Sequence, residues 1–241
     1  MSVLGQMVID VKQSLRTGEM TITGRLVDAS NATLLARVDD GGDGVKCIYK
    51  PIAGERPLWD FPHGTLAYRE YAAYLLSSLG GFEVVPFTIL RNGPYGEGAV
   101  QQWIEIDTSI DLIEFFQRDE PGLRRMALFD AVINNTDRKI GHLLPTTSGQ
   151  ILGCDHGVTF HVDDKLRTVL WQWAGQKLNI EELEILKNLL ILLDGSLGQE
   201  LADLLNEYEI SALRMRTSDL CKSAVFPHPN PEWPSVPWPP F

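Results

Sequence analysis

Residues 20–51 read MTITGRLVDASNATLLARVDDGGDGVKCIYKP, and this stretch indicates how the first half of the chain folds. Residues 20–27 alternate apolar and polar side chains, which is typical of a half-buried β-strand. Residues 33–38 and 45–50 are short apolar runs, and a cluster of turn-forming Asp, Asn, Ser or Gly residues precedes each of them. The stretch therefore predicts three consecutive antiparallel strands.

The remaining segments divide the chain into a strand-rich half and a helical half. A helix over 66–79 and strands over 84–90 and 99–104, joined by a hairpin over 91–98, follow the first three strands. From residue 107 onward the apolar spacing is mostly helical. Segregated strands and helices predict an α+β fold with two lobes. The other expected helices cover residues 3–15, 109–116, 121–134, 180–193, 197–208 and 210–219, and a short strand pair covers 143–144 and 150–153.

We accordingly expect a strand-rich N-terminal lobe over 1–106, a helical C-terminal lobe over 107–226 and a tail over 227–241. The tail holds seven of the 14 prolines, so it predicts an extended segment that is neither helix nor inner strand. It also contains Trp233 and Trp238. Two interpretations stay open for it: a segment that wraps its own lobe, or a polyproline ligand for a partner.

The composition excludes several classes of protein. With 44% apolar residues the chain can bury a core, and its net charge of −11 opposes broad docking on nucleic acid or anionic membrane. No stretch reaches the roughly 20 apolar residues of a membrane span, and no secretory signal is visible. The three cysteines, Cys47, Cys154 and Cys221, form no CxxC pair. These features predict a cytoplasmic protein with free thiols.

The densest polar cluster is NNTDRKIGH at residues 134–142, and GCDHG follows at 153–157. Each lies next to a short expected strand, so Asp137 and Asp155 can converge on one cation. Phosphoryl transfer uses such an arrangement, with one carboxylate for the nucleophile and another for Mg²⁺. In the simpler alternative, Asp137 and Arg138 cap the preceding helix and pair with each other.

The strand-rich half carries candidate nucleotide-binding residues. Lys50 ends a predicted strand and Glu70 lies early in the next helix, and kinases use a helix glutamate to hold a strand lysine near the phosphates. Lys46 has the same strand parity as Lys50, and the simpler alternative is a surface lysine with an unrelated glutamate. The motif GxxxxGK[ST] is absent, which excludes a P-loop NTPase. Candidate phosphate-binding residues in the first turn are Ser30, Asn31 and Thr33.

Taken together, these motifs resemble a known family. The segments YKP at 49–51, GERPLWDFP at 54–62, NTDRKIGH at 135–142 and DHG at 155–157 resemble an actinobacterial family labelled phosphatidylinositol 3-/4-kinase-like. That family is related to phosphatidylinositol kinases and HipA-type kinases. The resemblance implies a bilobed protein-kinase-like fold and a phosphotransferase that uses ATP with Mg²⁺ or Mn²⁺ on an unidentified acceptor.

The resemblance also implies roles for individual residues. Lys50 would contact the ATP phosphates and Glu70 would orient it. Asp137 would be the catalytic base or would position the nucleophile, and Asp155 would bind the metal. The adenine would meet backbone groups of the segment between the lobes. In that segment the candidate residues are Gln102, Trp103, Ile104 and Glu105.

One position departs from the family pattern. The broader kinases place a metal-binding Asn five residues after the catalytic Asp, and here that residue is His142. Imidazole is a poorer ligand for Mg²⁺ than for Mn²⁺ or Zn²⁺, and Asn135 is the alternative second ligand. Either the metal preference shifts or catalysis is weakened.

Other functions therefore stay open. The chain is an active kinase, a nucleotide-binding pseudokinase or scaffold without turnover, or an enzyme that transfers AMP with the same residues. A more distant alternative is a metallohydrolase whose ligands would be His142, Asp155, His156 and His161. The sequence shows no basic amphipathic helix or Lys/Arg cluster, so a soluble metabolite or a protein is favoured over a membrane lipid as acceptor.

Overall fold

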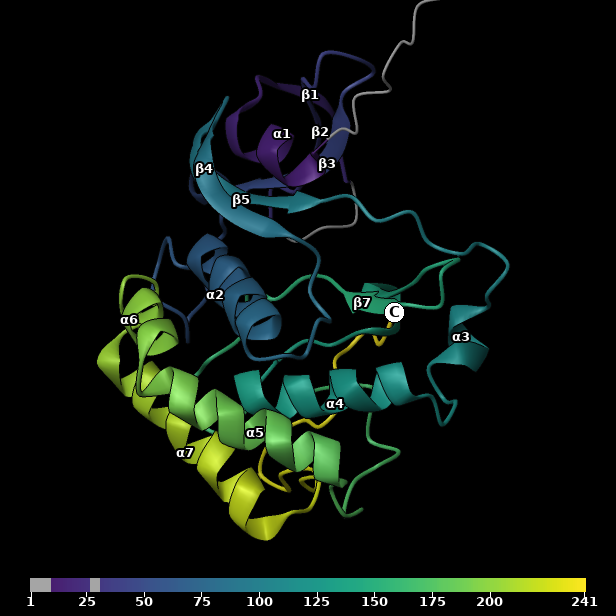
Figure 1. Cartoon of the computed structure of the whole chain (residues 1–241), viewed down its shortest axis with the longest axis vertical. Helices are drawn as coiled ribbons and strands as arrows, with labels where there is room; N and C mark the ends of the chain where they lie inside the picture. Colours follow the sequence, from purple (N-terminus) through teal and green to yellow (C-terminus); the bar gives the residue numbers. More distant parts are fainter. Residues whose placement is uncertain (1–9, 27–30) are drawn as a thin grey trace, which may run out of the picture. The chain divides into compact units, whose positions relative to one another are not determined.

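The computed structural model describes residues 10–26 and 31–241, which form two compact units (Figure 1). The first unit comprises the described residues up to Arg56 together with Phe87–Trp103, and the second comprises Pro57–Pro86 and Ile104–Phe241. Strands dominate the first unit and helices the second, so the predicted α+β class is confirmed. Residues 57–86, expected with the strand-rich lobe, group with the helical unit.

The first unit contains one antiparallel sheet. Its strands are β1 (Met20–Arg25), β2 (Leu34–Val38), β3 (Val45–Pro51), β4 (Thr88–Gly93) and β5 (Gly96–Gln102). They lie in the order β1-β2-β3-β5-β4, which confirms the three consecutive strands expected at the start. Helix α1 (Val11–Thr17) packs beside the sheet, and Arg91 of β4 donates to the carbonyls of Leu15 and Gly18. The earlier part of the helix expected over 3–15 falls outside the described residues.

The hairpin between β4 and β5 is tighter than predicted. Residues 91–98 were expected as a loop, but Gly93 pairs with Gly96 and only residues 94–95 make the turn. Gly96 has a φ of 91°, a conformation that favours glycine, and this allows the chain to reverse within two residues.

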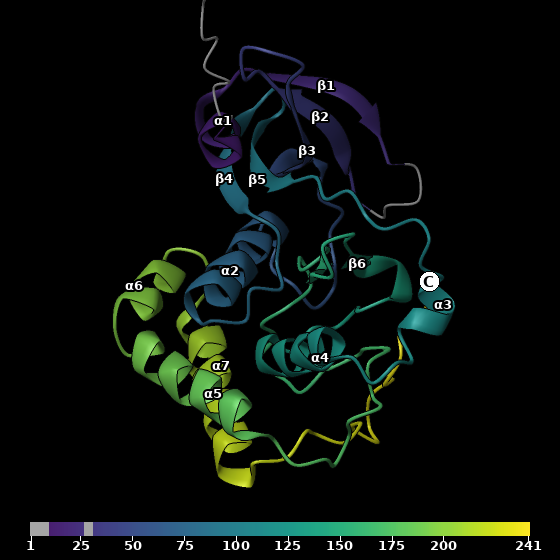
Figure 2. The ribbon, with the colours of Figure 1, turned by 45° about the vertical axis from the view of Figure 1, so that its right-hand side comes forward.

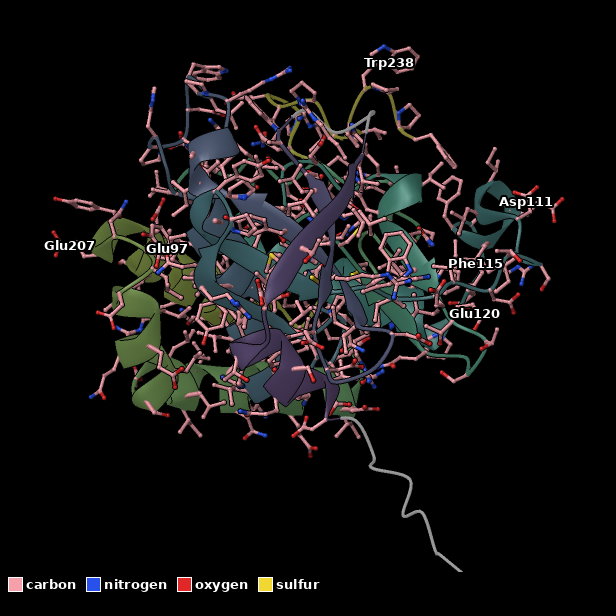
Figure 3. The ribbon with its side chains drawn as sticks, turned by 90° about the horizontal axis from the view of Figure 1, so that it is seen from above. Glu97, Asp111, Phe115, Glu120, Glu207 and Trp238 are labelled. Atoms are coloured by element: carbon pink, nitrogen blue, oxygen red, sulfur yellow. The ribbon has the colours of Figure 1, made fainter. Side chains whose placement is uncertain are left out.

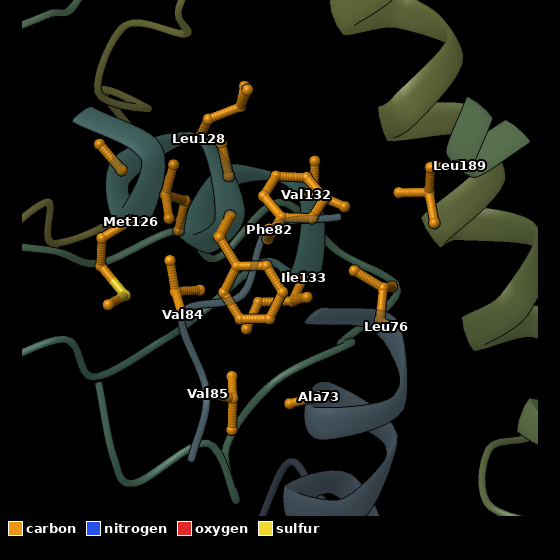
Figure 4. Packing of buried hydrophobic residues seen from close by; sticks show 14 of the residues in the cluster. Ala73, Leu76, Phe82, Val84, Val85, Met126, Leu128, Val132, Ile133 and Leu189 are labelled. Carbon is orange, nitrogen blue, oxygen red and sulfur yellow. The ribbon is translucent and has the colours of Figure 1, made fainter. Parts of the chain in front are cut away.

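The second unit is a helical assembly with one small strand pair. Its helices are α2 (Leu66–Leu79), the short α3 (Leu112–Phe115), α4 (Pro121–Ile133), α5 (Ile180–Leu193), α6 (Ser196–Ala202) and α7 (Glu207–Ser223). Between α4 and α5 the chain forms the 3-10 turn η2 (Ile140–His142) and the strand pair β6 (Leu143–Pro145) and β7 (Ile151–Gly153). Figure 2 shows α5, α6 and α7 side by side. Figure 4 shows Leu76 of α2, Phe82, Val132 of α4 and Leu189 of α5 meeting in the core, where all four are fully buried.

Several predicted helix boundaries are wrong, and the helix expected over 109–116 spans only Leu112–Phe115. The helix expected over 197–208 ends at Ala202, and α7 begins at Glu207 instead of near residue 210. The Asn206 side chain accepts the N–H of Glu209, whose carboxylate accepts the N–H of Asn206. This capping box fixes the start of α7, and the N-x-x-E pattern was present in the sequence.

Buried polar contacts connect α2 to α7. Arg69 of α2 is 1% exposed, pairs with Glu209 of α7 and donates to the Thr159 carbonyl at 2.6 Å. Among the described helices, none is both long enough and apolar enough to cross a bilayer.

Candidate active site

The loop after α4 has an inner and an outer layer of polar side chains. Asn134 ends α4 in a left-handed conformation (φ 53°) and turns the chain into the loop. Asn135 and Arg138 then point inward and are fully buried, whereas the Asp137 side chain keeps 27% of its surface exposed. Thr136 is also buried, so Asp137 is the outward-facing residue between buried neighbours.

Arg138 organises the inner layer. Its Nη2 lies 2.9 Å from Asp130 Oδ1 in the last turns of α4, and both side chains are fully buried. Its Nη1 donates to the Cys154 carbonyl at 2.8 Å, and its Nη2 lies 2.7 Å from His156 Nε2. Because a guanidinium only donates, that imidazole nitrogen accepts. Arg138, which follows Asp137, thus contacts both neighbours of Asp155.

Asn135 completes the inner layer. Its Nδ2 donates to Asp130 Oδ1 at 2.9 Å, and its Oδ1 accepts the N–H of Asp137 at 3.0 Å. Both ends of the amide shape the loop, so Asn135 is placed to support Asp137. The alternative in which Arg138 pairs with Asp137 is wrong, because Arg138 pairs with Asp130.

The outer layer brings Asp137 close to two cations and one carboxylate. Its Oδ2 lies 3.6 Å from Lys139 Nζ and its Oδ1 lies 3.5 Å from Arg167 Nη2. Burial raises the pKa of Asp137, Asp155 raises it further, and Lys139 and Arg167 oppose the increase. The two loop carboxylates singled out in the sequence therefore lie near each other.

Asp155 adopts an unusual backbone conformation. Its φ is 62°, in the left-handed region, and its side chain is 50% exposed with Oδ2 3.5 Å from His142 Nε2. The Cys154 N–H donates to the His142 carbonyl at 3.1 Å, which ties the two loops together. Non-glycine residues in this region cluster at functional sites, and this geometry makes Asp155 and His142 candidate ligands.

These two side chains form a sparse ligand set for a divalent ion. In the described part of the chain, no three His, Cys, Asp or Glu side chains converge on one point. His156 faces Arg138, and His161 Nε2 lies 3.2 Å from Lys165 Nζ, so neither joins Asp155. Mg²⁺ is usually held by one or two protein carboxylates with phosphates and water, so a sparse protein ligand set fits such an ion.

In the first unit, Lys50 and Lys46 occupy different surroundings on the same face of β3. Lys50 pairs with Ala99 of β5 and is half-buried, whereas Lys46 pairs with Arg37 of β2 and is exposed. Strand parity alone did not separate them. A half-buried lysine packs its aliphatic stem against neighbouring residues and keeps its ammonium group at the surface, where a ligand can reach it.

Residues of the candidate phosphate-binding turn form hydrogen bonds within the first unit. Ser30 lies outside the described residues. Asn31 Oδ1 accepts the N–H of Arg56 at 2.8 Å, Thr33 is 7% exposed, and its N–H donates to the Asn31 carbonyl. The described part of the turn is therefore shaped by internal hydrogen bonds.

The adenine-binding candidates differ in their backbone contacts. The N–H of Gln102 donates to the Phe87 carbonyl at 2.8 Å and that of Trp103 to the Lys46 carbonyl at 3.2 Å. Those two N–H groups therefore already have backbone partners. In the second unit, Glu70 is 2% exposed in α2, and a Cβ on Gly157 would lie 3.6 Å from Glu70 Oε1.

Comparison with known proteins gives one related sequence. No family model matches the chain. Over 262 aligned positions the chain is 43% identical to Protein Rv2133c of Mycobacterium tuberculosis, and the alignment covers 94% of each protein. The chain belongs to the Rv2133c family.

One solved structure shows that this Rv2133c-family chain has a kinase-like fold. The Golgi casein kinase structure aligns with a TM-score of 0.56 at 13% identity, covering 90% of this chain and 76% of that one. The Helicobacter pylori proinflammatory kinase CtkA aligns with a TM-score of 0.47 at 12% identity, covering 87% and 93%. The first comparison shows the bilobed kinase-like fold, as the motifs implied.

Arg167 is the residue of the candidate site in this chain that could not be found from the sequence. It is an isolated arginine ten positions after Gly157, with no motif around it. Its segment pairs with the loop: the Arg167 N–H donates to the Asn135 carbonyl, and its Nε donates to the Thr136 carbonyl at 2.6 Å. Only this long-range pairing brings the guanidinium to Asp137.

Proposed function

We propose that the chain is an ATP- and divalent-metal-dependent phosphotransferase. One observation carries the proposal: Arg138, next to Asp137, contacts Cys154 and His156 on either side of Asp155, so two loops of a kinase-like fold bring both carboxylates to one region. Phosphoryl transfer needs one carboxylate to orient the attacking hydroxyl and another to hold the metal. Two partly exposed carboxylates that serve one centre fit these two roles.

Asp137 is the proposed base or nucleophile positioner. Its raised pKa brings the carboxylate closer to the range in which a general base works well. Lys139 and Arg167 flank it at 3.6 and 3.5 Å. These cations hold the carboxylate in place and supply positive charge where a phosphoryl group would be transferred.

Asp155 and His142 are the proposed metal-binding residues. When bound, Mg²⁺ or Mn²⁺ would neutralise negative charge on the nucleotide phosphates. The exposed Asp155 carboxylate supplies the hard oxygen donor that both ions accept, and His142 favours Mn²⁺ of the two. Asn135 is not proposed as a ligand, because its side-chain amide already bonds to Asp130 and to the N–H of Asp137.

The roles of the other predicted residues rest on the family resemblance. We propose that Lys50 binds phosphate, that Glu70 orients that lysine, and that backbone groups of residues 102–105 meet the adenine. Replacing Lys50 with Met should weaken nucleotide binding, and Glu70→Gln should do so to a smaller extent. A matched Lys46→Met variant separates Lys50 from its neighbour on the same face.

The acceptor is proposed to be a cytoplasmic metabolite or protein. The phosphatidylinositol label of the resembling family is not adopted, because the net charge of −11 opposes binding to anionic lipid. A second candidate is nucleotide binding without turnover. His142 in place of the usual Asn is the observation that favours it.

The test is transfer of label from ATP in the presence of Mg²⁺ or Mn²⁺, with water and the protein itself as acceptors. γ-Labelled ATP reports phosphoryl transfer and α-labelled ATP reports AMP transfer. Asp137→Asn and Asp155→Asn should each reduce γ-phosphoryl transfer by about 100-fold or more. Asp163→Asn is the matched control, because that carboxylate is 73% exposed and outside the proposed site.

Three outcomes would contradict the proposal in different ways. Transfer that persists in both site variants rejects the assigned residues. Nucleotide-dependent stabilisation without any transfer supports the second candidate. Neither stabilisation nor transfer with either ion rejects both candidates.

A further inference from the structure

The C-terminal segment lies along the loops of the proposed site. In Figure 2 the yellow tail leaves α7 and follows the lower edge of the second unit past α4. The Asn230 Nδ2 donates to the Asp164 carbonyl at 3.1 Å, and Lys165 Nζ lies 5.0 Å from the ring centre of Trp233. The tail thus first follows the segment that leads to Arg167.

Two stronger anchors follow, and both use carbonyl groups of the tail. The Ser235 carbonyl accepts the N–H of Thr168 at 3.0 Å and the indole N–H of Trp171 at 2.8 Å. The Pro240 carbonyl accepts the N–H of Ile140 at 2.8 Å. A Cβ on Gly141 would meet the Phe241 ring at 3.7 Å, so the ring packs on that glycine.

The anchored residues neighbour the reacting groups. Thr168 follows Arg167, and Ile140 follows Lys139, so the tail holds the residue next to each cation that flanks Asp137. The segment 167–169 is itself paired with the loop, because the N–H of Val169 donates to the Arg138 carbonyl at 3.2 Å. Tail, Arg167 segment and catalytic loop therefore form one hydrogen-bonded ladder.

The tail leaves the carboxylates open. With the tail in place, Asp137 keeps 27% and Asp155 keeps 50% of its side-chain surface exposed. A segment that blocked the site would cover them. Trp238 projects outward and is 88% exposed between the two anchors (Figure 3), so its ring does not contribute to the anchoring.

We propose that residues 230–241 form a strap that positions the catalytic loop and Arg167 for phosphoryl transfer. The strap acts on the loop backbone through the Ser235 and Pro240 carbonyls. This inference rests on the proposed function for its effect on turnover, but its effect on the loop can be measured without any activity.

The experiment compares the full chain with a chain that ends at Pro234, which keeps Asn230 and Trp233 and loses both carbonyl anchors. Amide hydrogen exchange at Thr168 and Ile140 should accelerate about tenfold or more, because each N–H loses its acceptor. Amides of α5 should exchange as before. The kcat for transfer should fall about tenfold or more, while the ATP concentration for half-maximal stabilisation should change less than twofold.

Two further variants test the anchoring itself. Trp171→Phe removes only the indole donor to Ser235 and should shift exchange at Thr168 and kcat in the same direction by a smaller factor. Trp238→Ala removes an exposed ring and should leave both unchanged. If the truncated chain fails to fold, Trp171→Phe decides the question.

Unchanged exchange at both amides overturns the strap, and so does faster exchange with an unchanged kcat. A kcat that rises on truncation overturns it in favour of an inhibitory tail. If the full chain transfers no phosphoryl group, the proposed function fails, and the strap is judged by amide exchange alone.

Discussion

The inner and outer layers of the loop after α4 are built from neighbouring residues but differ in burial and in charge. Asp130, Asn135 and Arg138 are fully buried, and Asn135 and Arg138 both donate to Asp130. Asp137 and Asp155 keep part of their surface exposed, and the pKa of Asp137 is raised. The inner layer contains one fully buried ion pair, whereas the outer layer places a second carboxylate, Asp155, near Asp137 and the two cations that flank it.

This difference separates stability from function. A buried ion pair that loses one partner leaves an uncompensated charge, so the inner layer should govern folding. Two nearby carboxylates repel each other and are tolerated where a site requires them, so the outer layer should govern chemistry at some loss of stability. Substitutions in the inner layer should therefore lower the free energy of unfolding, whereas removal of a carboxylate from the outer layer should raise it.

The largest effect is expected in the inner layer. Arg138→Met leaves the buried Asp130 without its partner and should lower the free energy of unfolding by about 3–5 kcal/mol. Chemical denaturation measures it. Arg125→Met is the matched control, because Arg125 pairs with Glu181 on the surface and should change stability by about 0–1 kcal/mol. Equal effects from the two substitutions would contradict the assignment of the inner layer.

A smaller effect is expected from Arg167. Arg167→Met removes a cation 3.5 Å from Asp137 and should lower kcat by about 10–100-fold, because a pre-positioned charge at the reacting group is lost. Nucleotide-dependent stabilisation should stay close to wild type. Arg125→Met again serves as the surface control, and an equal loss of activity there would refute a specific role for Arg167.

The smallest effect tests the stability of the outer layer against pH. The raised pKa of Asp137 means that its contribution to stability is present below the ordinary Asp pKa of about 3.9 and is lost as pH rises through the folded-state pKa. Asp137→Asn should therefore match wild type in acid and be more stable at neutral pH. Thermal denaturation of the nucleotide-free protein measures this.

Asp107 provides the control of opposite sign. Hydrogen bonds from the Ser109 hydroxyl and N–H lower the pKa of Asp107, so its contribution is present at neutral pH and lost in acid. Asp107→Asn should be less stable than wild type at neutral pH. If both variants shift in the same direction, the interpretation of the outer layer is wrong.

The sequence predicted those parts of the fold that depend on local pattern. The helices over 66–79 and 180–193 have the predicted bounds, because apolar spacing and capping residues act within a few positions. The loop carrying Asp137 was recognised from a compact motif. The break before α7 was missed, although its capping box was visible at Asn206 and Glu209.

Long-range pairing explains what could not be predicted. Arg167 reaches Asp137 only because its segment pairs with the loop, and no spacing rule connects those positions. The partner of Arg138 is Asp130, eight residues earlier in a helix, and the adjacent Asp137 was the simpler choice. The carbonyl anchors of the tail leave no trace in side-chain sequence, because any residue offers a carbonyl.

The most direct test of the account is the thermal stabilisation of wild type, Asp137→Asn and Asp155→Asn by ATP with Mn²⁺ or Mg²⁺. At 100 times Kd a ligand adds about 2.7 kcal/mol, which is several degrees in Tm for a chain of this size. We predict that wild type and Asp137→Asn are stabilised in a metal-dependent way and that Asp155→Asn is not. Equal stabilisation of all three proteins, with or without metal, would contradict the assignment of Asp155 to the metal and Asp137 to the acceptor.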